Sequence, residues 1–248
     1  MVAVENLINQ FHPISLKEMD GVKLLDRVDT KYVCSLFKLS DILRDLIGEY
    51  NILEINDRRI MSYQTKYYDT ANFKMYHDHQ NGKLNRYKVR EREYINSELN
   101  FLEVKFKNNK SRTLKTRIVK SEKLNWFNNS EIDFLDCKSP FSSEDLEVKL
   151  LNTFQRITLS NQIERVTIDF GLEFKNSKGD NGLFPSLAII EVKQSKFSIN
   201  SEVIKVLKKH QVRPCSFSKY CIGTTLVYPH LKSNRFKSKI LLINKLSA

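Results

Sequence analysis

Basic residues occupy every second position in several segments of the chain. In RYKVRER, alternate positions hold Arg86, Lys88, Arg90 and Arg92, and alternate side chains of a strand point to one face. Such a strand would present a row of cations that can bind an anion. The same alternation recurs elsewhere, with Arg27, Asp29 and Lys31; Glu103 and Lys105; Lys115 and Arg117; Arg165 and Asp169; Glu191 and Lys193; and, as single basic residues of two further segments, Arg156 and Lys219.

Without Arg86, which we place at a strand end, these positions hold twelve basic residues and four acidic ones. Burying an ion costs several kcal/mol, whereas a domain is stable by only about 5–15 kcal/mol, so a dry core cannot hold this set. For any single strand, a charged face open to solvent is the commoner explanation. Because the pattern repeats on many strands, we expect a wet cavity that binds a polyanion.

Phosphate is the anion that this composition suits. Arginine can clamp phosphate oxygens in a bidentate manner, and lysine acts as a point charge. The few acidic residues among the cations would have a role if a divalent cation bridges carboxylate and phosphate oxygens. The charged face therefore predicts a phosphate-binding cavity with a metal.

The elements that would position these residues are mostly strands, because apolar and polar residues alternate with period two along most of the chain. The expected strands cover residues 23–35, 51–56, 59–69, 84–95, 99–107, 113–120, 154–159, 163–170, 186–194 and 216–228. Short amphipathic helices are expected from their caps and spacing over residues 15–21, 40–48, 142–151 and 200–210. The apolar faces of the strands must close into a barrel or be covered by these helices.

Composition and length limit the class of protein. The 248 residues carry a formal net charge of +12, yet 41% of them are hydrophobic, which excludes a disordered basic tail. No run of about 18 apolar residues predicts a transmembrane segment, and the N-terminus lacks a signal-peptide pattern. The four cysteines form no Cys-x-x-Cys pair, as is usual in a reducing compartment. We therefore expect a cytoplasmic protein.

No linker divides the chain, so we expect a single domain over residues 1–230, followed by a basic tail over residues 231–248. The tail holds one apolar run, Ile240 to Ile243. A helix or strand that docks on the domain is the simple interpretation of this run, and contact with a partner or a membrane surface is the alternative.

Several charged segments occur in a fixed order from about residue 23 to residue 228: LLDRVDTKYV, YYDTANFKMYHDHQNGKLNRYKVREREY, FLEVKFK, RITLSNQIERVTIDF, IIEVKQ and SFSKYCIG. This ordered set resembles the VTC domain, the polyphosphate polymerase branch of the triphosphate tunnel metalloenzymes, a CYTH-like superfamily. The resemblance implies an α+β fold in which antiparallel strands form a closed β-barrel, the tunnel, with amphipathic helices packed outside.

The resemblance also implies an activity. ATP or another nucleoside triphosphate would give its γ-phosphate to a chain of inorganic polyphosphate, with Mn²⁺ or Mg²⁺ as the cofactor. Carried over by position, the phosphate contacts fall on Lys31, Arg90, Arg92, Lys105, Arg156 and Lys219, and the metal falls on Glu191. We expect catalysis to depend on Lys31, Arg90, Arg92, Lys105 and Glu191. The alternation adds Arg27, Lys88, Lys115, Arg117, Arg165 and Lys193 as phosphate-binding candidates, and Glu103 and Asp169 as metal-binding candidates.

The chain departs from the family pattern at two places. Arg27 and Asp29 stand where the general tunnel signature has two acids, which favours the polymerase branch over plain triphosphatases. Ser216 stands where the family often has a further basic residue, and Arg213 is a candidate to replace it.

Three other functions stay open: hydrolysis of triphosphates or polyphosphate, binding of polyphosphate or a nucleotide without catalysis, and nucleic-acid binding. The last is disfavoured because Tyr87, Val89 and Phe106 lie on the strand faces opposite the cations, so that no aromatic platform for bases interleaves with them. We therefore expect no nucleic acid as a partner. The oligomeric state is unknown from the sequence.

Overall fold

The computed structural model describes residues 2–20, 28–110, 112–120 and 126–247. Its strands form one sheet, whose main path runs in the order β2, β10, β9, β8, β4, β5, β6, β7 with antiparallel neighbours. A parallel pair, β1 and β3, joins this path at β8. The strand bounds are β1 Pro13–Ile14, β2 Val28–Ser35, β3 Asn51–Leu53, β4 Met61–Asp69, β5 Arg86–Tyr94, β6 Leu99–Lys107, β7 Thr113–Val119, β8 Glu147–Ser160, β9 Glu164–Lys175 and β10 Asn181–Gln194.

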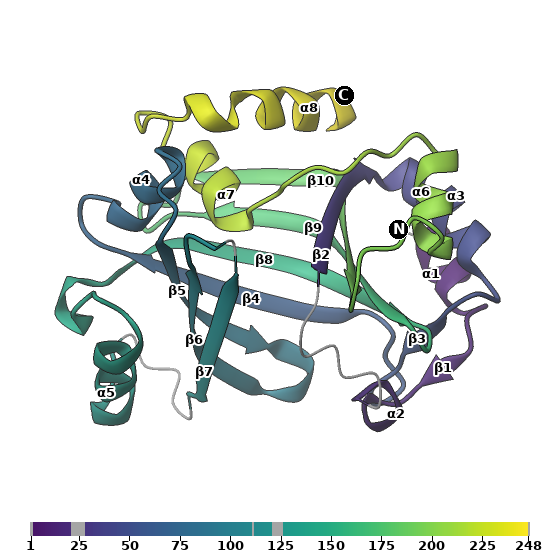
Figure 1. The fold of residues 1–248 in the computed structure, drawn as a ribbon, viewed down its shortest axis with the longest axis horizontal. Helices are drawn as coiled ribbons and strands as arrows, with labels where there is room; N and C mark the ends of the chain where they lie inside the picture. The colour runs from purple at the N-terminus through teal and green to yellow at the C-terminus, as the bar shows by residue number, and fades with distance from the viewer. Residues whose placement is uncertain (1, 21–27, 111, 121–125, 248) are drawn as a thin grey trace.

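Helices surround the sheet (Figure 1). Helices α1, α3 and α6 lie together on one side, α4, α7 and α8 gather at another, and α5 stands apart beside β6 and β7. Their bounds are α1 Val2–Ile8, α2 Leu16–Asp20, α3 Leu36–Leu46, α4 Lys74–Gln80, α5 Asn129–Lys138, α6 Glu202–Lys209, α7 Lys219–Val227 and α8 Lys237–Ser247.

The sheet is strongly curled, but hydrogen bonds between its described residues do not close it. Strands β5 to β7 turn away from the layer of β8 to β10 and lie mainly below it in the view of Figure 1, and within the described residues no ladder joins β2 to β7, the two ends of the path. In the same part of the chain, β7 pairs along one edge only, with β6. The α+β class with an antiparallel sheet is as expected, whereas the closed barrel is not confirmed.

The apolar faces of the strands are buried under helices. Ile168 and Ile190 of the sheet pack with Leu39, Ile42 and Leu43 of α3, and all five side chains are completely buried. A second layer covers β5 and β6, where Val89 and Leu102 pack with Leu135 of α5. These residues alternate with the cations of the same strands, so one face of each strand builds the core and the other is left for charge.

The expected strand over residues 216–228 is wrong, because the structure has helix α7 there. The side chain of Ser218 caps the helix by accepting a hydrogen bond from the backbone N–H of Cys221. Most of the helix is buried, so it has no polar stripe that would reveal a helix in the sequence. Gly223 allows the close approach, since a Cβ there would overlap the ring of Phe174 and lie 2.8 Å from Cδ2 of Leu150.

The apolar run of the C-terminal tail lies on α8, which packs against the rest of the chain. Ile243 is 1% exposed and belongs to the same core as Phe184 and Tyr220, with Ile240 and Leu246 at its edge. This docked helix is the simple interpretation made from the sequence. None of the helices in the described residues has the length and apolarity needed to cross a membrane.

Other expected elements need correction at their ends or in their type. The helix over 142–151 is wrong: its capping serine supports only one 3₁₀ turn, Ser143–Asp145, because the following residues pair with β4 as the start of β8. The helix expected from residue 40 begins one turn earlier, at the Ser35 cap. The helices over 15–21 and 200–210 are confirmed as α2 and α6. Helices α1, α4 and α5 were not expected.

Candidate functional site: a cationic cavity inside the curled sheet

The curl of the sheet encloses a cavity of about 620 Å³ to which every strand of the main path contributes a side chain. The two ends of the path converge on it. The charge of Glu191 on β10 acts on the pKa of Lys105 on β6, and that of Lys31 on β2 acts on the pKa of Lys88 on β5. Eleven of the twelve basic residues expected to bind phosphate line this cavity: Lys31, Lys88, Arg90, Arg92, Lys105, Lys115, Arg117, Arg156, Arg165, Lys193 and Lys219.

The twelfth, Arg27, lies outside the described residues. Of the acids, Asp29, Asp169 and Glu191 line the cavity, and Glu103 is completely buried behind Arg90. Neither Ser216 nor Arg213 lines the cavity, and both are exposed.

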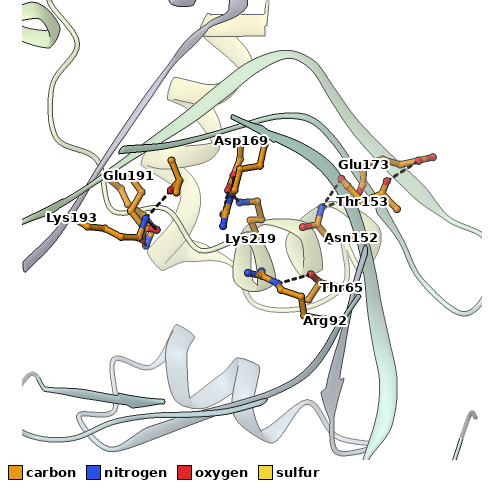
Figure 2. A network of polar contacts seen from close by, with 12 residues as sticks. Thr65, Arg92, Asn152, Thr153, Asp169, Glu173, Glu191, Lys193 and Lys219 are labelled. Atoms are coloured by element: carbon orange, nitrogen blue, oxygen red, sulfur yellow. Dashed lines mark hydrogen bonds and ion pairs between the residues drawn. The ribbon is translucent and has the colours of Figure 1, made fainter. Parts of the chain in front are cut away.

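Glu191 lies close to Lys193 (Figure 2) and is held between two lysines. Its Oε1 lies 2.6 Å from Nζ of Lys31, and its Oε2 lies 2.8 Å from Nζ of Lys193. The ammonium group of Lys193 also donates a hydrogen bond to Oγ1 of Thr167, at 2.8 Å. Burial works to raise the pKa of Glu191, but the charges of the two lysines hold it well below its usual value. Glu191 is therefore an ionised carboxylate that faces the cavity.

Asp169 is held between an arginine and a lysine. Arg156 donates two hydrogen bonds to it, from Nε to Oδ1 at 2.5 Å and from Nη2 to Oδ2 at 2.8 Å, and Nζ of Lys219 also contacts Oδ2. Burial opposes the charge of Asp169, but Arg156 and Lys219 lower its pKa. Lys219 is the first residue of helix α7, so the start of this helix lies next to strands β8 and β9.

Glu103 forms the third group of this kind. Its Oε2 accepts a hydrogen bond from Nε of Arg90 at 2.6 Å, and its Oε1 lies 2.5 Å from Nζ of Lys115. The side chain of Glu103 is fully buried, while that of Arg90 is 8% exposed. Burial works to raise the pKa of Glu103, but Arg90, Arg92 and Lys115 lower it. Each of the three carboxylates therefore has two cationic partners.

Three further cations of the cavity that are buried or half-buried have no carboxylate partner within the described part of the chain: Lys88, Arg92 and Lys105. Lys88 donates a hydrogen bond to Oγ of Ser218 at 3.0 Å, and Nε of Arg92 donates one to Oγ1 of Thr65 at 3.3 Å. The charge of Arg90 and burial lower the pKa of Lys105 well below its usual value. Burial lowers the pKa of Lys88 to about 8. We call these three residues the unpaired cations.

An aromatic pair beneath the cations was missed by the sequence analysis. The rings of Tyr63 and Phe154 face each other across β4 and β8 with centroids 5.1 Å apart. The guanidinium of Arg92 lies 5.7 Å from the Tyr63 centroid, and Nζ of Lys219 lies 4.3 Å from that of Phe154. Cation–π contact of this kind holds a charge in place without neutralising it. The sequence did contain an indication of this pair: Tyr63, Thr65 and Tyr67 occupy alternate positions of β4, so their side chains share one face of the strand.

Two other predicted residues stand at the wall of the cavity. The guanidinium of Arg117 lies 4.3 Å from the ring centroid of Phe101, and Nη2 of Arg165 donates a hydrogen bond to the backbone oxygen of Met19 at 3.0 Å. Within the described residues, no three His, Cys, Asp or Glu side chains gather as a ready-made metal site. The eleven cations that line the cavity favour anions in the first place.

The chain matches the VTC domain family over residues 26–228. Among solved structures, a candidate adenylate cyclase from Bacillus halodurans is 14% identical, with a TM-score of 0.51 over 78% of this chain and 94% of that chain. The Hippeastrum protein HpAC1, a candidate adenylyl cyclase with a dominant triphosphatase activity, is 10% identical, with a TM-score of 0.49 over 80% of this chain and 95% of that chain. No curated protein sequence matches. Because the family match spans most of the chain, including all eleven described cations of the cavity, the protein belongs to the VTC domain family.

Proposed function

We propose that this protein is a polyphosphate polymerase that transfers the γ-phosphate of ATP to a chain of inorganic polyphosphate in the cavity. The observation that carries the proposal is the group of unpaired cations, Lys88, Arg92 and Lys105. They lie in a cavity where three carboxylates, Glu191, Asp169 and Glu103, are already shared between other cations. Buried charge without a partner is costly. Phosphate oxygens would supply the missing partner, since arginine and lysine are the side chains that bind phosphate best.

The reaction needs alignment and charge neutralisation more than covalent chemistry. An oxygen of the terminal chain phosphate attacks the γ-phosphorus, the bond from that phosphorus to the β–γ bridging oxygen breaks, and ADP leaves. The chain becomes one phosphate longer. Arg90, Arg92 and Lys105 would neutralise charge on the transferred group, and Asp169 and Glu103 would hold Arg156 and Arg90 in position.

A divalent metal fits this donor set at Glu191. Mg²⁺ and similar ions are commonly held by one or two carboxylates together with substrate phosphates, and Glu191 is the carboxylate whose two partners are both lysines. Lys31 and Lys193 have flexible stems and can turn to phosphate oxygens when Glu191 contacts a metal. Mn²⁺ or Mg²⁺, when bound there, would neutralise charge on the phosphates and help to align them.

The test of the activity is incubation of the protein with ATP and Mn²⁺, followed by gel electrophoresis of the products. The polymerase is expected to give long polyphosphate and one ADP for each phosphate added. Orthophosphate from tripolyphosphate, with no long chains from ATP, would instead identify a hydrolase. Tight binding of polyphosphate with neither product would identify a binding protein.

We expect tripolyphosphate binding to take up protons at about pH 8.5. Burial lowers the pKa of Lys88 and of Lys219 to about 8 in the free protein, so a fraction of each is neutral at that pH. A bound anion favours the charged form, and protons must enter with it. At a pH well below these pKa values both lysines are already charged, so they take up no protons when the anion binds. Calorimetric titrations in two buffers of different ionisation enthalpy measure the number of protons.

The matched control for this linkage is Lys88→Gln, which should lower the proton uptake in the alkaline titration. A titration at about pH 6 should show no contribution from Lys88 or Lys219 in either protein. Release of protons by the unsubstituted protein at the higher pH would contradict the assignment of neutral lysines to the free cavity.

A further inference from the structure

The cations on the β5–β6–β7 wall are arranged in rows that run across the three strands. The hydrogen-bond register places Arg90 opposite Glu103 and Glu103 opposite Arg117, which is one row. The next row toward the start of β5 places Lys88 opposite Lys105 and Lys105 opposite Lys115. The row beyond that places Arg86 opposite Lys107. Adjacent rows on one strand face are about 7 Å apart.

The first of these three rows contains a carboxylate, and the next two contain none on β5 and β6. The first row has Glu103 between two arginines, whereas the second and third rows hold cations only on β5 and β6. Like charges directly opposite each other destabilise a sheet. Two successive rows of this kind, side by side on one face, indicate a binding surface for an extended anion.

The third row lies beyond the cavity described above but is continuous with it. Neither Arg86 nor Lys107 belongs to the cavity wall, and both are half-buried. His79 of α4 lies close to the cations of both the second and the third row. Burial together with the charges of Lys88, Arg86 and Lys107 lowers the pKa of this histidine to about 2. His79 is therefore neutral and adds no cation of its own.

Among the residues that the structure describes, nearby acidic groups do not neutralise the third row. Asp78 is the acid on α4, and it pairs with Lys74 and Lys83, at 2.6 and 3.4 Å. Arg86 donates a hydrogen bond from Nη1 to the backbone oxygen of Lys83, at 2.8 Å, which is a neutral acceptor. Within the described residues, neither Arg86 nor Lys107 forms an ion pair.

We propose that Arg86 and Lys107 extend the phosphate-binding cavity and bind a linear polyphosphate chain beyond the phosphates held by Lys88 and Lys105. The inference rests on the proposed function, in that it takes the cavity to be a phosphate site. It adds a preference for chain length: a short ligand held inside the cavity by the unpaired cations leaves Arg86 and Lys107 without contact, whereas a longer chain that fills the cavity reaches them. The chain bound there is the growing product or a long acceptor, which share the same chemistry.

The test compares two ligands on the same protein. The variant Arg86→Gln/Lys107→Gln is titrated with tripolyphosphate and with long-chain polyphosphate. The matched control is Lys205→Gln/Lys208→Gln, which removes the same charge from exposed positions of α6. We expect the first variant to lose about 10- to 100-fold in affinity for the long chain, as two hydrogen-bonding contacts of ordinary net strength would give. The affinity of the first variant for tripolyphosphate should fall by no more than about threefold. The affinities of the control variant for both ligands should stay within the same limit.

Gel analysis of the products separates the two sources of the chain. Given the expected loss of affinity, shorter product from ATP with normal use of added long acceptor indicates that the extension guides the growing chain, whereas weak use of added long acceptor indicates that it binds the acceptor. Either result supports the extension. Equal losses for both ligands, or no loss for either when the unsubstituted protein binds both, would overturn the extension and leave the cavity standing. Failure of the unsubstituted protein to bind either ligand would instead overturn the proposed function.

Discussion

Replacing Lys105 with glutamine is expected to lower polymer formation about 10²- to 10³-fold, as removal of one well-placed charge does in other active sites. The same change should raise the melting temperature of the ligand-free protein. Lys105 has no carboxylate partner in the described structure, and the charge of Arg90 together with burial lowers its pKa well below the usual value. A cation in such surroundings favours function and opposes stability.

Activity assays and thermal unfolding of the same preparations check both effects. Each kcal/mol gained should raise the melting temperature by about 2–4 °C in a domain of this size. Lys110→Gln is the control, because Lys110 is exposed in the turn between β6 and β7 and should change neither quantity. A large loss of stability in Lys105→Gln would mean that Lys105 has a structural partner, and near-normal activity would remove it from the phosphate site.

Glu103→Gln is expected to destabilise the ligand-free protein by about 3–5 kcal/mol, the usual result of removing one member of a buried ion pair. The change leaves Arg90 and Lys115 without their carboxylate, beside Arg92. Tripolyphosphate should restore much of the lost stability, because phosphate oxygens can replace the carboxylate as the anion. Thermal or denaturant unfolding with and without the ligand measures this rescue.

Glu131→Gln is a matched control for this rescue. Glu131 is also a buried carboxylate paired with a lysine, Lys120, at 2.7 Å, but it belongs to α5 and does not line the cavity. It should destabilise the protein, and tripolyphosphate should stabilise it by the same amount as the unsubstituted protein, whereas Glu103→Gln should gain more. Equal rescue of both variants would show that the anion acts on the whole fold and not at the Glu103 group.

The pH dependence of the Glu103 effect has a definite sign. The native pKa of Glu103 lies below the unfolded value, so its contribution to stability is present above the unfolded pKa and is lost as the pH falls through the native one. The difference in stability between the unsubstituted protein and the Glu103→Gln variant is therefore largest near neutral pH and shrinks in acid.

The alternation of side chains made the cavity predictable from the sequence. Arg90, Lys105 and Glu191 belong to three strands, and the parity of each residue within its own strand was enough to place all three on the inner side of the sheet. Because the opposite face of each strand is apolar and must be buried, the charged faces could only point inward or to solvent. The repetition of the pattern decided between these two outcomes.

Other features depend on tertiary contacts that no local pattern contains. Helix α7 is buried where Gly223 packs against Phe174. Because most of its residues are buried, they show no helical pattern of polar positions, and the sequence analysis predicted a strand there. The sharing of each carboxylate between two cations depends on cross-strand register, as in the pairing of Arg156 with Asp169, which sets the two residues opposite each other. Register also decides whether the ends of the sheet meet, and the alternation of residues carries no information on closure.

The central claim is that the unpaired cations bind the phosphates, and a crystal structure with tripolyphosphate tests it most directly. The account predicts phosphate oxygens within hydrogen-bonding distance of Lys88, Arg92 and Lys105 inside the curled sheet. Tripolyphosphate bound on the outer surface, with these three side chains still lacking an anionic partner, would contradict it.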